Sequence, residues 1–191
     1  MGYLELVLIA VGLSMDAFAV AVTIGITSKD AVKSVMIKRG LITGLYFGFF
    51  QGLMPLTGYL LGTQFADKIS AFDHWVAFVL LCLIGAQMVI GSLKKDDEKP
   101  KEVSMKLKKM LPLAIATSID ALAVGVSFAM VGVEIVPAVL TIGITTFVLS
   151  FAGVFIGKVF GGRFKSKAEL LGGVILILIG LKILIEHLFF Q

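Results

Sequence analysis

The sequence predicts an all-α membrane protein with six transmembrane helices, arranged as two inverted three-helix repeats with both termini outside. Three observations predict this fold: the composition, the placement of Lys and Arg, and a motif that occurs twice. Of the 191 residues, 58% are apolar and 16% are charged, and the mean hydropathy is +1.02. A soluble chain of this size needs more polar surface to cover itself. The composition therefore excludes an ordinary soluble enzyme, a nucleic-acid-binding module and a disordered chain.

Each predicted span is an apolar stretch of about 20 residues, the length that crosses a bilayer as a helix. The spans are expected at Leu4–Ile26, Gly40–Gly62, Trp75–Leu93, Met110–Val131, Ile135–Val159 and Leu170–Phe189. We expect the first span to be retained, because a signal peptide has a basic start and no Lys or Arg precedes Lys29. The hydrophilic linker 94–109 separates a first repeat, 1–93, from a second, 110–191.

Basic residues predict the orientation of the spans. Fifteen of the 17 Lys and Arg residues fall at the ends of, or in the loops after, the first, third and fifth predicted spans. Cytoplasmic loops of membrane proteins carry an excess of Lys and Arg, so these loops are expected inside and both termini outside. The net charge of +4 is then a sign of orientation and not of a nucleic-acid partner.

A repeated motif predicts that the two halves are related. The pattern S-x-D-A-x-A-V-x-V begins at Ser14 and again at Ser118, 104 positions later. Glycines of the second and fifth spans align at an offset of 99, which pairs Gln51 with Ser150. Because each half has an odd number of spans, the second half is inverted relative to the first. Transporters with this arrangement place their substrate site near the midplane, between the repeats.

Asp16 and Asp120 occupy matching positions near the middle of the first and fourth spans. Inserting an Asp there costs at least about 2.5 kcal/mol, and such groups usually face a polar interior. A pseudo-two-fold axis would bring the two carboxylates together, where they repel unless a proton or a cation relieves them. The alternative, a structural hydrogen-bonding role for each Asp, gives no reason for their symmetry.

The side chains near this pair predict which cation would bind. They are oxygen donors: Ser14, Gln51, Thr117 and Ser118. Cys82 is the single cysteine, so no second thiolate is available. Oxygen ligands suit Mg²⁺, Ca²⁺ and Mn²⁺ better than Zn²⁺ or Cu⁺. These residues together with Asp16 and Asp120 therefore predict a site for a hard divalent cation, and they leave the metal itself open.

Lys182 is a cation deep inside the sixth predicted span. It has two interpretations. With Glu186 at i+4 it could form a structural ion pair. Alternatively, its ammonium compensates the charge of an aspartate when no metal is bound.

Four stretches of the chain resemble the MntP-type manganese efflux pumps of bacteria, which are related to the lysine-exporter superfamily. They are SMDAFA from Ser14, ATSIDALAVG from Ala116, GFFQ from Gly48 and HWVAF from His74. The resemblance covers essentially the whole chain. It implies a six-helix exporter of Mn²⁺, multi-pass in the inner membrane, whose essential acidic residues are Asp16 and Asp120. Gln51 stands where some members carry Glu.

The expected function is therefore secondary active export of a divalent cation, Mn²⁺ by the resemblance, in exchange for protons. Moving a cation against an inside-negative potential costs about 2.3 kcal/mol per charge per 100 mV, and the sequence has no phosphate-binding loop for ATP. The expected partners are the metal ion as substrate, protons and the lipid bilayer. No cofactor and no nucleic acid are expected, and a homo-oligomer is left open.

Two other functions stay open at this point. One is export of small organic cations or amino acids on a similar scaffold. The other is an intramembrane aspartyl enzyme, which also uses two aspartates that share a proton. The usual signature of such enzymes places Gly directly before the catalytic Asp, whereas Met15 and Ile119 stand there in this chain. We therefore expect a transporter and not an enzyme.

Overall fold

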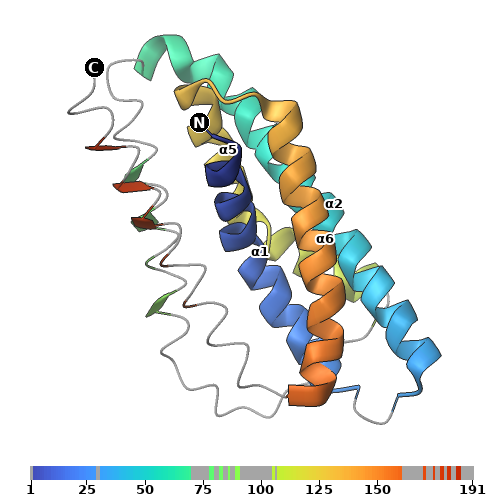
Figure 1. Cartoon of the computed structure of the whole chain (residues 1–191). Helices are drawn as coiled ribbons and strands as arrows, with labels where there is room; N and C mark the ends of the chain where they lie inside the picture. Colours follow the sequence, from blue (N-terminus) through green and yellow to red (C-terminus); the bar gives the residue numbers. More distant parts are fainter. Residues whose placement is uncertain are drawn as a thin grey trace.

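The computed structural model describes residues 2–28, 31–69, 78–79, 82–83, 86, 89–90, 105, 107–160, 170, 174, 177–178, 180–181 and 184–185. This part of the chain is helical (Figure 1). Its labelled helices are α1 (Tyr3–Ile26), α2 (Lys33–Ile69), α4 (Leu107–Ala116), α5 (Ile119–Val131) and α6 (Ile135–Phe160). The predicted spans Trp75–Leu93 and Leu170–Phe189 and the linker 94–109 lie largely outside the described residues.

Two helices, α1 and α6, are long and apolar enough to cross a membrane, and α4 with α5 makes a third if that bent pair is one span. They correspond to the first, fifth and fourth spans that the sequence predicts. Helix α2 has 37 residues and extends beyond the predicted second span at both ends. Lys33, Lys38 and Arg39 near its start, together with Gln51 and Pro55, make α2 less apolar than α1 and α6. The described chain is thus an all-helical membrane protein.

Large apolar side chains stand exposed along one side of α2 and one side of α6. They recur every fourth residue: Leu41, Leu45, Phe49 and Leu53 on α2, and Val136, Leu140, Ile144 and Val148 on α6. An i, i+4 spacing places residues on one helix face. An exposed apolar stripe outside a packed core is costly in water and suits lipid.

Glycines bring the helices into backbone contact. Helix α2 crosses α6 at Gly48 and Gly143, where a Cβ built on either glycine would lie 2.8 or 3.1 Å from the carbonyl oxygen of the other. A Cβ on Gly157 of α6 would lie 2.0 Å from the Val22 oxygen of α1. Small residues at these crossings therefore let the helices pack closely.

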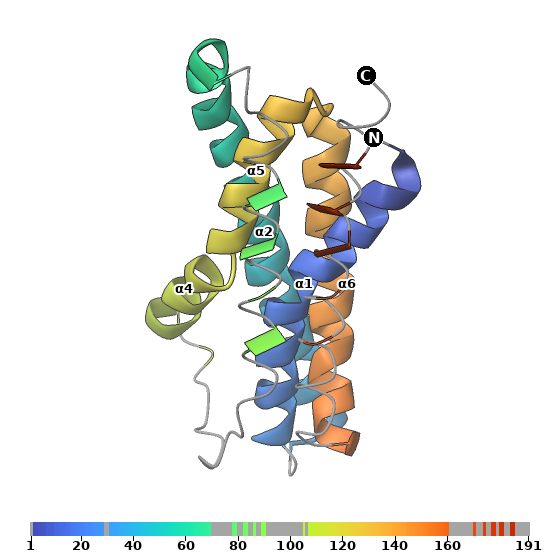
Figure 2. The same cartoon turned by 90° about the vertical axis from the view of Figure 1, so that its left-hand side faces the viewer.

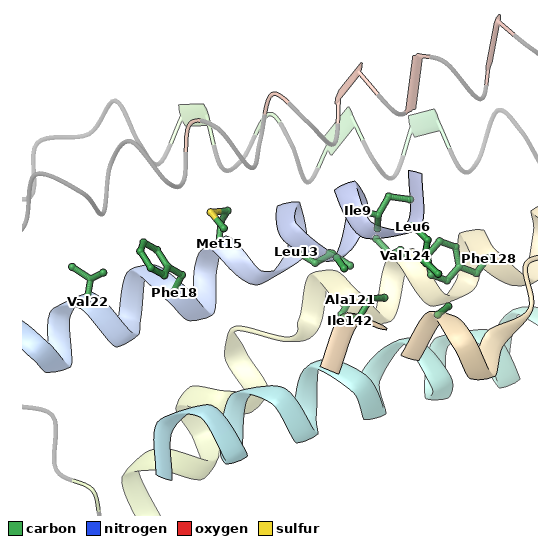
Figure 3. Packing of buried hydrophobic residues seen from close by; sticks show 12 residues of the cluster. Leu6, Ile9, Leu13, Met15, Phe18, Val22, Ala121, Val124, Phe128 and Ile142 are labelled. Carbon is green, nitrogen blue, oxygen red and sulfur yellow. The ribbon is translucent and has the colours of Figure 1, made fainter. Parts of the chain in front are cut away.

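The main apolar core lies where α1, α5 and α6 meet. Figure 3 shows Leu13 of α1, Ala121 of α5 and Ile142 of α6 turned toward one another. Met15 is buried, and its side chain points away from α5 and α6 in the same view. This core fixes the position of α1 just beside Asp16, so the packing and the candidate site belong to one region.

The prediction of one continuous helix at Met110–Val131 is wrong in one respect. This segment is broken into α4 and α5, with a bend of 41° between them. Figure 2 shows α4 directed away from α5. Pro112 removes one backbone donor from α4. At its end, the hydroxyls of Thr117 and Ser118 bond to the Leu113 and Ala114 carbonyls at 3.1 and 2.8 Å, and such bonds compete with continued helix.

Candidate functional site

Gln51 is fully buried on α2 and joins three segments of the chain. Its Nε2 donates a hydrogen bond to the Leu13 carbonyl of α1 at 3.0 Å. Its Oε1 accepts one from the Ser118 hydroxyl, at the start of α5, at 2.9 Å. The two bonds orient the amide fully, so its position relative to α1 and α5 is fixed.

Asp120 lies in the first turn of α5, because the break before Ile119 makes a new helix start there. Its Oδ1 accepts a hydrogen bond from the Ala121 backbone N–H at 2.8 Å. Its Oδ2 is buried and has no hydrogen-bond partner in the described part of the chain. The positive end of the helix dipole favours a carboxylate at this position, and one carboxylate oxygen is left to bind something else.

Asp16 of α1 is half-buried and close enough to Asp120 for the two charges to interact. The Gln51 amide also lies close enough to act on the Asp120 carboxylate. Among the residues that the structure describes, no Lys or Arg forms an ion pair with either aspartate. Two neighbouring carboxylates without a compensating charge repel each other, and a bound cation or a proton relieves that repulsion.

A second buried polar contact joins α1 to α6. The hydroxyls of Ser14 and Thr146 lie 2.7 Å apart, and neither residue is exposed. Ser14 also bonds to the Ala10 carbonyl at 2.6 Å, and Thr146 to the Ile142 carbonyl at 2.8 Å. Sequence reasoning placed Ser14 at the site but missed Thr146.

A different repeat offset could have found Thr146. Ser118 follows Ser14 by 104 positions, and Thr146 follows Gln51 by 95. The offset of 99 seen in the glycines pairs Gln51 with Ser150 instead. It is Thr146 that meets Ser14 as Gln51 meets Ser118, whereas the buried Ser150 hydroxyl has no partner in the described part. The spacing of the glycines alone therefore does not determine which residue of α6 corresponds to Gln51 of α2.

The structure gathers four of the six predicted ligands, namely Asp16, Asp120, Gln51 and Ser118. Ser14 turns instead to Thr146. The Thr117 hydroxyl bonds to carbonyls of its own helix, those of Leu113 and Ala114, both at 3.1 Å. Lys182 lies outside the described residues.

The gathered side chains offer carboxylate, amide and hydroxyl oxygens. Within the described residues there is no group of three or more His, Cys, Asp or Glu side chains that could hold a metal. The site therefore combines two carboxylates with neutral oxygens, a donor set that suits hard divalent cations. Ionisable side chains in the interior of a helical membrane protein are rare, and they are typical of membrane proteins that move ions or protons.

Comparison with known proteins gives the family within that class. The model of the family described as "Putative manganese efflux pump" matches residues 34–184. A protein of Desulfitobacterium hafniense (strain Y51) is 58% identical, over 100% of this chain and 98% of its own length. Its counterpart in Acetivibrio thermocellus is 53% identical, over 98% of this chain and 93% of its own length. Both are named "Putative manganese efflux pump MntP".

A further relative carrying the same name, from Clostridium perfringens (strain 13 / Type A), is 50% identical over 98% of this chain and 96% of its own length. No solved structure matches the chain. The chain belongs to the family of manganese efflux pumps, which confirms the resemblance seen in its sequence motifs.

Proposed function

We propose that this protein exports Mn²⁺ from the cytoplasm across the inner membrane as a secondary active transporter that takes up protons in exchange. The observation that carries the proposal is the pair of neighbouring aspartates beside Gln51, with Asp120 Oδ2 buried and unpartnered among the described residues. Membership in a family of manganese efflux pumps supports the metal and the direction.

The proposed architecture is six spans in two inverted repeats. Three sets of contacts support it. Helix α1 packs on α6 as α5 packs on α2. The Ser14–Thr146 contact of the first pair matches the Ser118–Gln51 contact of the second. The reciprocal crossing of Gly48 and Gly143 supports a two-fold axis between α2 and α6 in the proposed architecture.

The proposed cytoplasmic side is the end where α1 stops, α2 begins and α6 stops. Arg39 of α2 donates a hydrogen bond to the Ser28 hydroxyl, and Lys158 Nζ of α6 donates one to the Ala31 carbonyl at 2.7 Å. Basic residues gather on the cytoplasmic side of membrane proteins. Both termini would then lie outside.

In the proposed cycle, the deprotonated pair binds Mn²⁺ on the cytoplasmic side, with Gln51 Oε1 and Ser118 Oγ as neutral oxygens nearby. After the metal leaves on the outside, Asp16 and Asp120 take up protons, which remove the repulsion during the return. Alternating access would come from one three-helix half moving against the other.

Flux of Mn²⁺ into inside-out proteoliposomes tests the site. We expect Asp16→Asn and Asp120→Asn each to abolish the flux, because the amide keeps the shape but loses the charge. Glu134→Gln is the matched control, since Glu134 is an exposed carboxylate before α6, and it should transport as the wild type does. Undiminished export by either aspartate variant would rule out the site.

An imposed pH gradient tests the coupling. A gradient that drives protons in the direction opposite to Mn²⁺ should accelerate Mn²⁺ movement, and its collapse by a protonophore should slow it. If the flux ignores the gradient, proton exchange is wrong. Displacement of bound Mn²⁺ by amino acids or organic cations would instead favour the other exporter function.

Lys182 is proposed to compensate the charge of the aspartates in the metal-free state. Replacing it by Lys182→Gln should then shift the pH dependence of transport, because the empty site would depend more on protons. An unchanged pH profile would favour a structural ion pair with Glu186.

A further inference from the structure

Two buried hydroxyls in the described chain lack hydrogen-bond partners. They belong to Thr43 on α2 and Ser150 on α6, and neither residue is exposed. A buried polar group without a partner is costly and uncommon in a folded protein. Valine or alanine would fill the same space without that cost. We therefore expect both hydroxyls to have hydrogen-bond partners in another conformation of the protein.

The level of each residue along α1 follows from its neighbours on the same helix face. Ser150 lies one turn after Thr146, which contacts Ser14, and one turn before Val154, which belongs to the same buried apolar cluster as Ala21. Its level along α1 is therefore between Ser14 and Ala21, beside or just past Asp16.

Thr43 lies on the matching face of α2. It is one turn before Phe47, which belongs to the same buried apolar cluster as Ala17. It is two turns after Met36, which belongs to the same cluster as Ala21 and Ile24. Its level is therefore between Ala17 and Ile24 of α1. Thr43 thus lies between Asp16 and the basic end of the helices, and Ser150 lies at or just past the level of Asp16 on the same side.

Apolar side chains close this region in the present conformation. One cluster contains Ala17, Phe47, Met110 and Ala114, and a second contains Ala21, Ile24, Met36 and Val154. The hydrogen bonds of Arg39 and Lys158 to the segment after α1 close its end. A cation that reaches Asp16 from this side must separate these contacts.

We propose that Thr43 and Ser150 line the passage from the cytoplasm to the aspartate pair, and that their hydroxyls contact the water shell of the divalent cation when the passage opens. This inference rests on the proposed function, which makes the basic end the entrance. A hydroxyl without a partner in the closed state gains one in the hydrated open state, so each hydroxyl favours opening.

The first test removes the hydroxyls. Thr43→Val and Ser150→Ala should each lower Mn²⁺ flux severalfold, while the Tm in detergent rises by roughly 2–4 °C because an unpartnered group is removed. Thr57→Val is the matched control, since the Thr57 hydroxyl is exposed on α2 and bonds to the Leu53 carbonyl at 3.0 Å. Wild-type flux in Thr43→Val and Ser150→Ala would overturn the proposal.

The second test measures access directly. In a Cys82→Ala background, which has no other cysteine, Thr43→Cys and Ser150→Cys are treated with a membrane-impermeant thiosulfonate from either side. We expect labelling from the cytoplasmic side, slowed by saturating Mn²⁺. Ser34→Cys, exposed at the start of α2, gives the rate for free access. Absence of labelling in a transport-active protein, or labelling from outside alone, would contradict the passage.

Different results would contradict the proposed function and the proposed passage. If the wild type moves no Mn²⁺ but Thr43→Cys is labelled from the cytoplasm, the proposed function fails and the passage stands. If the wild type exports Mn²⁺, Asp16→Asn does not, and both hydroxyl variants export at the wild-type rate, the function stands and the passage fails.

Discussion

At the scale of single residues, the amide of Gln51 donates one hydrogen bond to Leu13 and accepts one from Ser118, so one side chain links α1, α2 and the start of α5. A carboxylate at this position could accept the hydrogen bond from Ser118, but it could not donate one to the Leu13 carbonyl. Gln51 therefore links the helices that carry the two aspartates, and in the proposed function its oxygen also lies near the metal.

Gln51→Leu tests this double role. It removes both hydrogen bonds from a buried position, and we expect a loss of roughly 1–3 kcal/mol in unfolding free energy together with weaker Mn²⁺ binding. Denaturation and binding titrations in detergent measure the two effects. Gln51→Glu keeps an acceptor for Ser118 and should recover part of the binding. Wild-type stability in Gln51→Leu would show that these bonds do not hold the helices together.

The Ser14–Thr146 contact is tested by a double-mutant cycle. Ser14→Ala and Thr146→Val each remove one hydroxyl, and their coupling in unfolding free energy should be about 0.6 kcal/mol, the average for such bonds in a membrane protein. Because the hydroxyls lie 2.7 Å apart, the double variant should lose less than the sum of the single variants. Strict additivity would mean that the contact adds no stability.

At the scale of helices, close packing depends on glycines whose missing Cβ leaves room for a neighbouring carbonyl. Gly157→Ala should push α1 from α6, because its Cβ would lie 2.0 Å from the Val22 oxygen. We expect destabilisation of roughly 1–3 kcal/mol or more and slower transport. Gly52→Ala is the milder control, with its nearest atom at 3.2 Å. Equal Tm values for the two variants would contradict this account of the packing.

The break between α4 and α5 also belongs to this scale. Hydropathy predicts one span from Met110 to Val131, because the apolar run continues through the break. Pro112, Thr117 and Ser118 are each tolerated inside membrane helices, so none of them alone predicts a bend. The bend moves the start of α5 to the site, and this gives Asp120 its place in a first helical turn.

At the scale of the whole molecule, the placement of Lys and Arg predicts that both termini lie outside and that the linker 94–109 lies in the cytoplasm. Alkaline phosphatase fused to the C-terminus should therefore be active, and green fluorescent protein fused there should be dark. The same reporters inserted in the linker should behave in the opposite way. An active phosphatase in the linker would overturn the proposed orientation.

From the sequence alone we could predict a helical membrane protein, the positions of α1 and α6, and a candidate site at two aspartates and one amide. These follow from hydropathy, motif repetition and the cost of burying a charge, and all three are properties of local sequence. The tertiary structure decided that Thr146 meets Ser14 and that Ser150 has no partner among the described residues. Such contacts join residues far apart in the chain. They depend on how far one helix is shifted along another, and glycine contacts between backbones set that shift rather than any pattern within a single helix.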